Sequence, residues 1–193
     1  MPNWTYNSLK VRDESQLSDE QIKKNNNPQE IESRKEIKRF VKENILPKEI
    51  TDINGKITGY EKDNKTLTFK GSVPRPKSLD ITSPAQTDEE KRIAEDNLKK
   101  YGHKNWYDWN IANWGCKWDA NCHSVEEDTE YGEVHIHFET PWCPPLEWLE
   151  KVSARYPSLQ FDMNVEEESN AFIGNPIAQG GKLCANIVDI NYP

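Results

Sequence analysis

Six side chains that could ligate a metal ion lie close together in the sequence. They fall within 28 positions and are Cys116, Cys122, His123, His135, His137 and Cys143. Thiolate and imidazole are the groups that zinc prefers in proteins, and His135 and His137 share one face if their segment is a strand. Glu133 and Glu139 would flank them there as hydrogen-bonding partners. Because the cysteine spacing matches no zinc knuckle, we assign no metal-binding residues or cofactor and keep a small metalloprotein only as an alternative.

Cys143 raises the question of a reactive thiol. The run Trp142-Cys143-Pro144-Pro145 precedes a predicted helix, and a helix N-terminus lowers the pKa of a thiol. The segment is similar to half of a thioredoxin site, but the second cysteine is missing. A helix that begins at proline, with a small buried residue at its cap, explains the run more simply. Phosphate-binding glycine loops, nucleophile elbows and H-E-x-x-H motifs are absent, so we predict no enzymatic activity and no catalytic residues.

The charge distribution bears on the class of partner. The chain has 193 residues, with 25 Lys and Arg against 33 Asp and Glu, and a net charge of -8. Residues 106–193 have a net charge of -11, whereas residues 1–105 have a net charge of +3. A general nucleic-acid binder is normally basic, whereas an acidic region is typical of a solubilising surface or of a surface for a basic protein partner. With neither a secretion signal nor an apolar run of about 18 residues, we expect a cytoplasmic protein with reduced cysteines and no membrane contact.

The hydrophobic pattern predicts the elements that must position these side chains. In residues 131–139, Val134, Ile136 and Phe138 alternate with polar residues, which predicts a half-buried strand with Glu133, His135, His137 and Glu139 outward. Proline, capping and turn signals predict the remaining elements. Residues 12–27 are predicted to form a loop or a disordered stretch. We expect strands at 4–11, 50–53, 56–61, 65–70, 159–165 and 183–190, a tight turn at Asn54-Gly55, and helices at 28–46, 87–102 and 144–156.

Tryptophan is concentrated in one segment. Four of the seven tryptophans fall between residues 106 and 118, at a spacing that keeps no single helical face. Large aromatic rings stabilise a protein most when they are buried. We therefore predict an irregular layer packed on the core, and an exposed binding surface is the alternative. The residues assigned to the structural core are Trp106, Trp109, Trp114, Trp118 and Trp142.

The order of elements predicts an α+β fold. A strand-helix-strand-strand-helix-strand core is typical of a ferredoxin-like sandwich, an antiparallel sheet with helices on one face. The other face would be free for a partner. We predict one domain over residues 1–193, with a divergent helix and hairpin region at 12–66. An insertion at 71–123 would carry the capped helix and the Trp-rich segment.

Several runs resemble a known family. They are Met-Pro-Asn-Trp at the start, YGHKNWYDWNIANWGCKWDA at 101–120, TPWCPP at 140–145 and Phe-Ile-Gly at 172–174. Together they are similar to the YubB ferredoxin-like family of phage and plasmid proteins, of the DUF1281 type, over residues 1–12 and 67–177. The resemblance implies a ferredoxin-like fold and a mobile-element origin, and no established activity. Cys116 and Cys143 depart from the family pattern, where Thr and Ser are expected.

These observations favour a non-enzymatic protein-binding module. It would be encoded by a phage, prophage or plasmid and would modulate a host or defence protein. A nucleic-acid-binding protein that uses the open sheet face is an alternative, which the acidic balance disfavours. The oligomeric state and the partner are not predicted. The residues assigned to partner binding are Glu126, Glu127, Asp128, Glu133, His135, His137 and Glu139.

Overall fold

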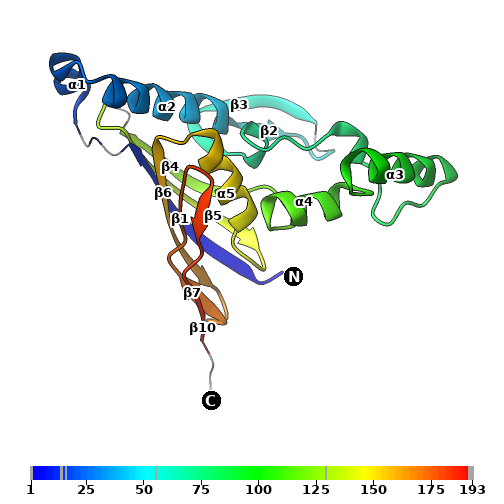
Figure 1. Ribbon diagram of the computed structural model, residues 1–193. Helices are drawn as coiled ribbons and strands as arrows, with labels where there is room; N and C mark the ends of the chain where they lie inside the picture. Colours follow the sequence, from blue (N-terminus) through cyan, green and yellow to red (C-terminus); the bar gives the residue numbers. More distant parts are fainter. Residues whose placement is uncertain (1, 14, 16, 55, 129, 191–193) are drawn as a thin grey trace.

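An antiparallel sheet around the first strand organises the chain (Figure 1). The computed structural model describes residues 2–13, 15, 17–54, 56–128 and 130–190. The strands of this sheet are β1 (Trp4–Asp13), β4 (Asn121–Asp128), β5 (Glu133–Pro141), β6 (Leu159–Glu167), β7 (Phe172–Gly174), β8 (Ile177–Gln179), β9 (Lys182–Cys184) and β10 (Ile187–Asp189). A separate hairpin consists of β2 (Ile45–Thr51) and β3 (Ile57–Leu67). The helices are α1 (Asp19–Asn25), α2 (Pro28–Asn44), α3 (Asp88–Tyr101), α4 (Trp106–Trp114) and α5 (Leu146–Arg155), with 3-10 turns η1 (Phe69–Gly71) and η2 (Lys77–Leu79).

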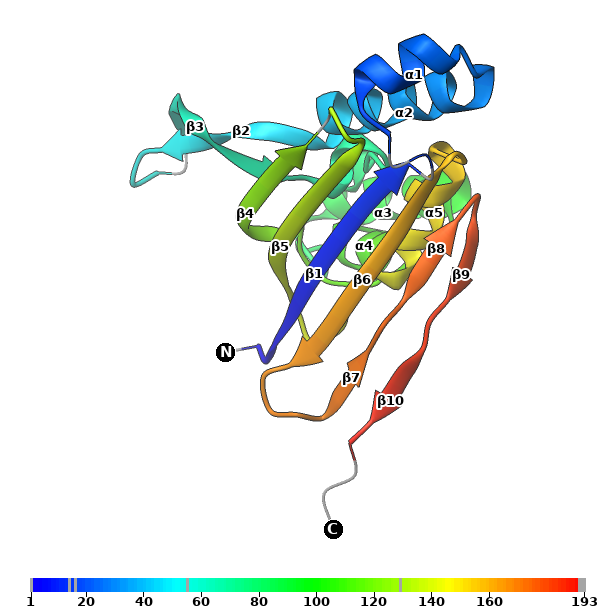
Figure 2. The same ribbon diagram turned by 90° about the vertical axis from the view of Figure 1, so that its left-hand side faces the viewer.

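The strand order is that of a ferredoxin-like domain. The main path runs β10-β7-β6-β1-β5-β4, and β8 also pairs with β6. Because α2 lies between β1 and β4 in the chain and α5 lies between β5 and β6, the central succession is strand-helix-strand-strand-helix-strand. Figure 2 shows the strands in front and α3, α4 and α5 behind them. The predicted fold, with helices on one sheet face, is confirmed.

The second strand of this core is not where the sequence suggested strands. It is β4, which follows the Trp-rich segment, whereas the predicted strands near 50–70 form the hairpin β2–β3. In β4 only Cys122 and Val125 are apolar, and the register shifts between Cys122 and Ser124. An edge strand needs few apolar residues, and a bulge interrupts the alternation by which strands are recognised. The predicted turn at Asn54-Gly55 lies partly outside the described residues.

Three further segments differ from the sequence-based expectation. Within 12–27, β1 continues to Asp13, and α1 begins after Ser18, which forms a capping box with Gln21. The Trp-rich segment is not irregular, since it contains helix α4 with Asn105 as its N-cap. The predicted strand at 183–190 is divided between β9 and β10. In α1 and α4 a capping side chain defines the start of the helix, and the break between β9 and β10 contains Asn186, whose φ is 41°.

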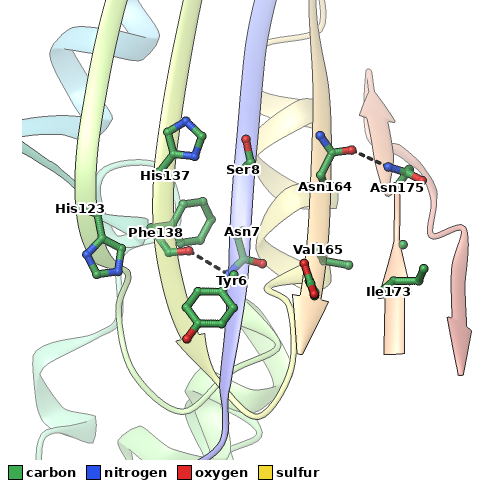
Figure 3. A pocket seen from close by; sticks show the side chains of 12 residues that line it. Tyr6, Asn7, Ser8, His123, His137, Phe138, Asn164, Val165, Ile173 and Asn175 are labelled. Atoms are coloured by element: carbon green, nitrogen blue, oxygen red, sulfur yellow. Dashed lines mark hydrogen bonds between the residues drawn. The ribbon is translucent and has the colours of Figure 1, made fainter. Parts of the chain in front are cut away.

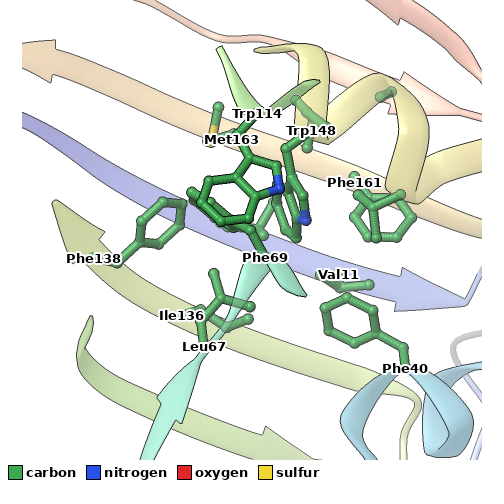
Figure 4. Packing of buried hydrophobic residues seen from close by; sticks show 14 of the residues in the cluster. Val11, Phe40, Leu67, Phe69, Trp114, Ile136, Phe138, Trp148, Phe161 and Met163 are labelled. Atoms are coloured by element: carbon green, nitrogen blue, oxygen red, sulfur yellow. The ribbon is translucent and has the colours of Figure 1, made fainter. Parts of the chain in front are cut away.

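The core lies between the sheet and helices α2, α4 and α5. Phe69 of η1 stands at its centre, with its ring centroid 4.7 Å from that of Trp148 and 5.8 Å from that of Trp114 (Figure 4). Phe138 of β5 packs on the same ring at 5.9 Å, and Phe40 of α2 closes the other end of the cluster. Val134, Ile136 and Phe138 are buried, as the alternation in 131–139 predicts, and so are the alternating Leu159, Phe161, Met163 and Val165 of β6.

A buried ion pair joins α2 to the end of β1. Arg34 Nε lies 2.7 Å from Asp13 Oδ2, and Arg34 Nη1 lies 3.0 Å from Asp19 Oδ1. The same guanidinium donates to the backbone carbonyls of Leu17 and Glu130. Gly132 (φ 73°) packs directly on the pair, where a Cβ would collide with the Asp13 carboxylate. Arg34 therefore connects β1, α1 and the β4–β5 turn.

Helix α3 offers a test of stability against pH. The Thr82 hydroxyl (2.7 Å) and the backbone N–H groups of Thr87 (3.1 Å) and Gln86 (2.9 Å) donate to the Glu90 carboxylate and lower its pKa to about 2. These bonds contribute stability above the ordinary pKa of 4.5, and the contribution is lost as the pH falls through about 2. We expect wild type and E90Q to differ most in urea midpoint at pH 6, with the gap closing towards pH 2. A gap that is constant with pH would contradict this assignment, and E95Q on the same helix is the control.

Candidate partner-binding face

The sheet face opposite the helices carries polar side chains in rows across four strands. The register places Glu139 of β5 opposite Tyr6 of β1, and Tyr6 opposite Glu166 of β6. The next rows join His137, Ser8 and Asn164, then His135, Lys10 and Asp162. The predicted outward orientation of Glu133, His135, His137 and Glu139 agrees with the burial pattern of β5. Within the described ranges, no helix covers this face (Figure 2).

The charges on these four strands are predominantly negative. Two cations on β1 are each neutralised, because Lys10 Nζ lies 2.8 Å from Glu133 and Arg12 Nε lies 3.2 Å from Asp162. Partial burial raises the pKa of Glu133, but the Lys10 ammonium and His135 outweigh this effect, so the pKa is below its ordinary value. The outward carboxylates with no Lys or Arg partner among the described residues are Glu126, Asp128, Glu139 and Glu166.

A shallow hollow occupies the middle of this face. Its volume is about 420 Å³, and imidazole, hydroxyl and amide groups line it together with an aromatic ring (Figure 3). His123 Nε2 lies 3.1 Å from Glu139 Oε1, so this histidine is held by a neighbouring carboxylate. Asn164 of β6 accepts a hydrogen bond from Asn175, which lies between β7 and β8. The side chains that define the hollow are Tyr6, Ser8, His123, His137, Asn164, Glu166, Ile173 and Asn175.

The structure separates the three acidic residues of β4. Glu126 lies opposite His135 and Asp128 opposite Glu133, so both belong to the open face. Glu127 lies opposite Val134, which is buried, and therefore points to the other side of the sheet. There its carboxylate pairs with Lys65 of β3 at 2.7 Å. Glu127 therefore does not share the open face with Glu126 and Asp128, because side chains alternate along a strand, and its assignment to partner binding stays a prediction.

The metal and thiol alternatives gain no support from the geometry. Cys116 is buried and Cys122 lies opposite Phe138 on the helix side, whereas His135 and His137 point to the open face. In the part of the chain that the structure describes, no group of three His, Cys, Asp or Glu side chains could hold a metal ion. Burial, and then the Glu147 charge, raise the pKa of Cys143, which opposes the thiolate expected at a helix N-terminus.

The tryptophans predicted to form the core divide into two groups. Trp109 and Trp114 are buried, and Trp106 is half-buried. Trp118 and Trp142 are 41% and 47% exposed, so their assignment to the core is wrong. Trp118 follows α4 in an extended loop, and Trp142 turns outward at the end of β5. Trp148 is fully buried like Trp114, although it was not among the predicted core residues.

The family comparison concerns the second half of the chain. Residues 113–190 match a family model described as the ferredoxin-like domain in Api92-like protein. This region belongs to that family. The Api92-like domain spans β4 to β10 and includes α5, and it confirms the predicted DUF1281-type, ferredoxin-like family. Because residues 1–112 lie outside the match, the single-domain organisation and its subdivisions at 12–66 and 71–123 stay predictions.

One solved structure is similar to the chain beyond this domain. It is the crystal structure of protein Api92 from Yersinia pseudotuberculosis, with 9% sequence identity and a TM-score of 0.45, covering 100% of this chain and 99% of that one. Among curated proteins, no match is found. Every helix within the described ranges is too short or too polar to span a bilayer.

The open-face residues of β5 were predicted from the sequence, but those of β1 and β6 were not. The alternation in 159–165 predicts Leu159, Phe161, Met163 and Val165 inward, and it leaves Asp162 and Asn164 outward. Tyr6 and Ser8 carry the equivalent signal in β1. Only the register, which brings β1 between β5 and β6, shows that these side chains form one surface with His137.

Proposed function

We propose that this chain is a non-enzymatic binding protein that docks a basic protein partner on its open sheet face. The observation that carries the proposal is the group of four outward carboxylates with no Lys or Arg partner among the described residues, Glu126, Asp128, Glu139 and Glu166. Carboxylates that lie close together on one face repel each other, and a basic partner bound on that face would reduce this repulsion. Of the predicted residues, Glu126, Asp128, Glu133, His135, His137 and Glu139 remain in the proposed surface.

The chemistry of the face favours a protein over a nucleic acid. Nucleic-acid binders gain most of their affinity from cations that neutralise phosphate, and here Lys10 and Arg12 are both engaged by carboxylates. The hollow between His137 and Asn164 offers polar contacts beside the Tyr6 ring, which suits an interface of mixed polarity. We propose a cytoplasmic role in which the protein, encoded by a phage, prophage or plasmid, modulates a host or defence protein.

Charge reversal on β4 tests the proposal. We expect E126K/D128K to lose at least about tenfold in the recovery of basic proteins from a bacterial lysate at low salt, because like charges would then face the partner. The measurement is a tagged pull-down of wild type and variant, with and without nuclease, read by quantitative mass spectrometry.

The matched control changes the same net charge at another place. E95K/D96K reverses two exposed carboxylates on α3, away from the open face, and should capture the same proteins as wild type. If both double variants lost the same fraction of captured protein, overall net charge would explain the loss, and the proposal would be wrong. Capture that disappears on nuclease treatment would instead assign the face to nucleic acid.

A further inference from the structure

Lys117 is held among three exposed aromatic rings. Its ammonium nitrogen lies 4.6 Å from the ring centroid of Trp118, 5.4 Å from that of Trp142 and 5.9 Å from that of Tyr107. A cation within about 6 Å of an aromatic ring is attracted by the ring quadrupole. No carboxylate among the described residues forms an ion pair with Lys117, so the rings are its counterpart. We name Tyr107, Trp118 and Trp142 the aromatic cluster.

Two features of Trp142 are energetically unfavourable, namely its exposed ring and its backbone conformation. Its side chain is 47% exposed, and its backbone has a φ of 66°. A bulky residue rarely adopts this left-handed conformation, and such outliers persist only where the surrounding structure holds them, often at functional sites. Trp118 is 41% exposed, and its centroid lies 6.1 Å from that of Trp142. The two large rings therefore contribute less to the core than their size allows.

The aromatic cluster continues the acidic open face. The Trp118 ring lies 6.4 Å from that of Trp4, which is opposite Pro141 at the beginning of β1. Trp4 points to the same side of the sheet as Tyr6, two residues further along the strand. Tyr6 in turn lies between Glu139 and Glu166. A basic segment lying on the carboxylates could thus reach the cluster at the end of the sheet.

We propose that the aromatic cluster accepts an arginine side chain of the basic partner, and that Lys117 occupies this position in the free protein. The inference rests on the proposed function, since both expect a basic protein. A planar guanidinium stacks on indole rings and is more weakly hydrated than an ammonium, so an incoming arginine can displace Lys117. Once displaced, the lysine side chain is long and flexible enough to turn to solvent.

A pair of peptides that differ only in charge tests this proposal. One carries a single arginine between glycine and serine residues, and the other carries citrulline, which has the same shape without the charge. We expect K117Q to bind the arginine peptide about threefold more tightly than wild type, because the resident cation is gone. The measurement is the shift of indole N–H signals in NMR titrations, with K182Q, which removes one exposed cation elsewhere, as the charge-matched control.

Variants at Trp142 provide a second test of the proposal. Glycine suits a φ of 66°, so W142G should keep or raise the melting temperature, while K117Q/W142G loses the gain in arginine binding. A melting temperature that falls markedly in W142G would make the ring structural and overturn the inference. Equal binding of the two peptides to K117Q, or an equal gain in K182Q, would also overturn it. Arginine binding together with failed lysate capture would contradict only the proposed function.

Discussion

Replacing Arg34 by methionine should lower the free energy of unfolding by about 3–5 kcal/mol. Arg34 and Asp13 have side chains 5% and 0% exposed, and their atoms are 2.7 Å apart. Methionine fills much of the same volume but leaves the Asp13 carboxylate buried without a counter-charge. It also leaves the Leu17 and Glu130 carbonyls without their donor. Urea unfolding followed by circular dichroism measures the loss.

A neighbouring ion pair provides the comparison for this variant. Lys38 Nζ lies 2.7 Å from Asp19, but both side chains are partly exposed, so K38M should cost less than about 1 kcal/mol. The double variant D13N/R34M should recover part of the loss, because the buried charge is removed together with its partner. If R34M and K38M had similar effects, the Arg34–Asp13 pair would have no special role in joining α2 to β1.

The second large effect is expected at Trp148. Replacing this residue by alanine should cost about 3–5 kcal/mol, because a large buried side chain leaves a cavity that the core fills only in part. The Trp148 side chain is fully buried, its ring packs 4.7 Å from that of Phe69, and its Nε1 donates to Ser72 Oγ at 3.0 Å. Thermal or urea unfolding of W148A gives the value.

Trp118 is the matched control for the same change of side chain. Because its ring is partly in solvent, W118A should shift the free energy of unfolding by less than about 1 kcal/mol. If W118A lost as much free energy of unfolding as W148A, the exposed rings would stabilise the fold as strongly as the buried ones. The division of the tryptophans described above would then be wrong.

The fold could be predicted because its strongest strands follow simple periods. In β5 and β6 apolar residues alternate strictly, and in α3 the capping box and Gly102 define both ends. The strand β4 was missed because an edge strand with a bulge needs little apolar surface. For the tryptophans, residue type predicts a preference for burial, but the turn at Trp142 decides the direction of the side chain.

The candidate site was predictable only within one strand. The sequence placed Glu133, His135, His137 and Glu139 on one side of β5, and the burial of β5 agrees. On β4 the structure places Glu126 and Asp128 on that face and Glu127 on the other, because successive side chains of a strand alternate. The partners on β1 and β6 come from pairings between residues more than a hundred positions apart, which no local pattern contains.

The bulge and the charges of β4 have a consequence for solubility. A regular strand at the rim of a sheet offers unpaired N–H and C=O groups on which a second copy of the chain can extend the sheet. The distortion at His123 makes this rim irregular, and the carboxylates of Glu126 and Asp128 would repel the same rim of a second copy. Evolution of the proposed binding face is therefore constrained, since neutral substitutions on β4 would favour aggregation, while substitutions that keep a charge would not.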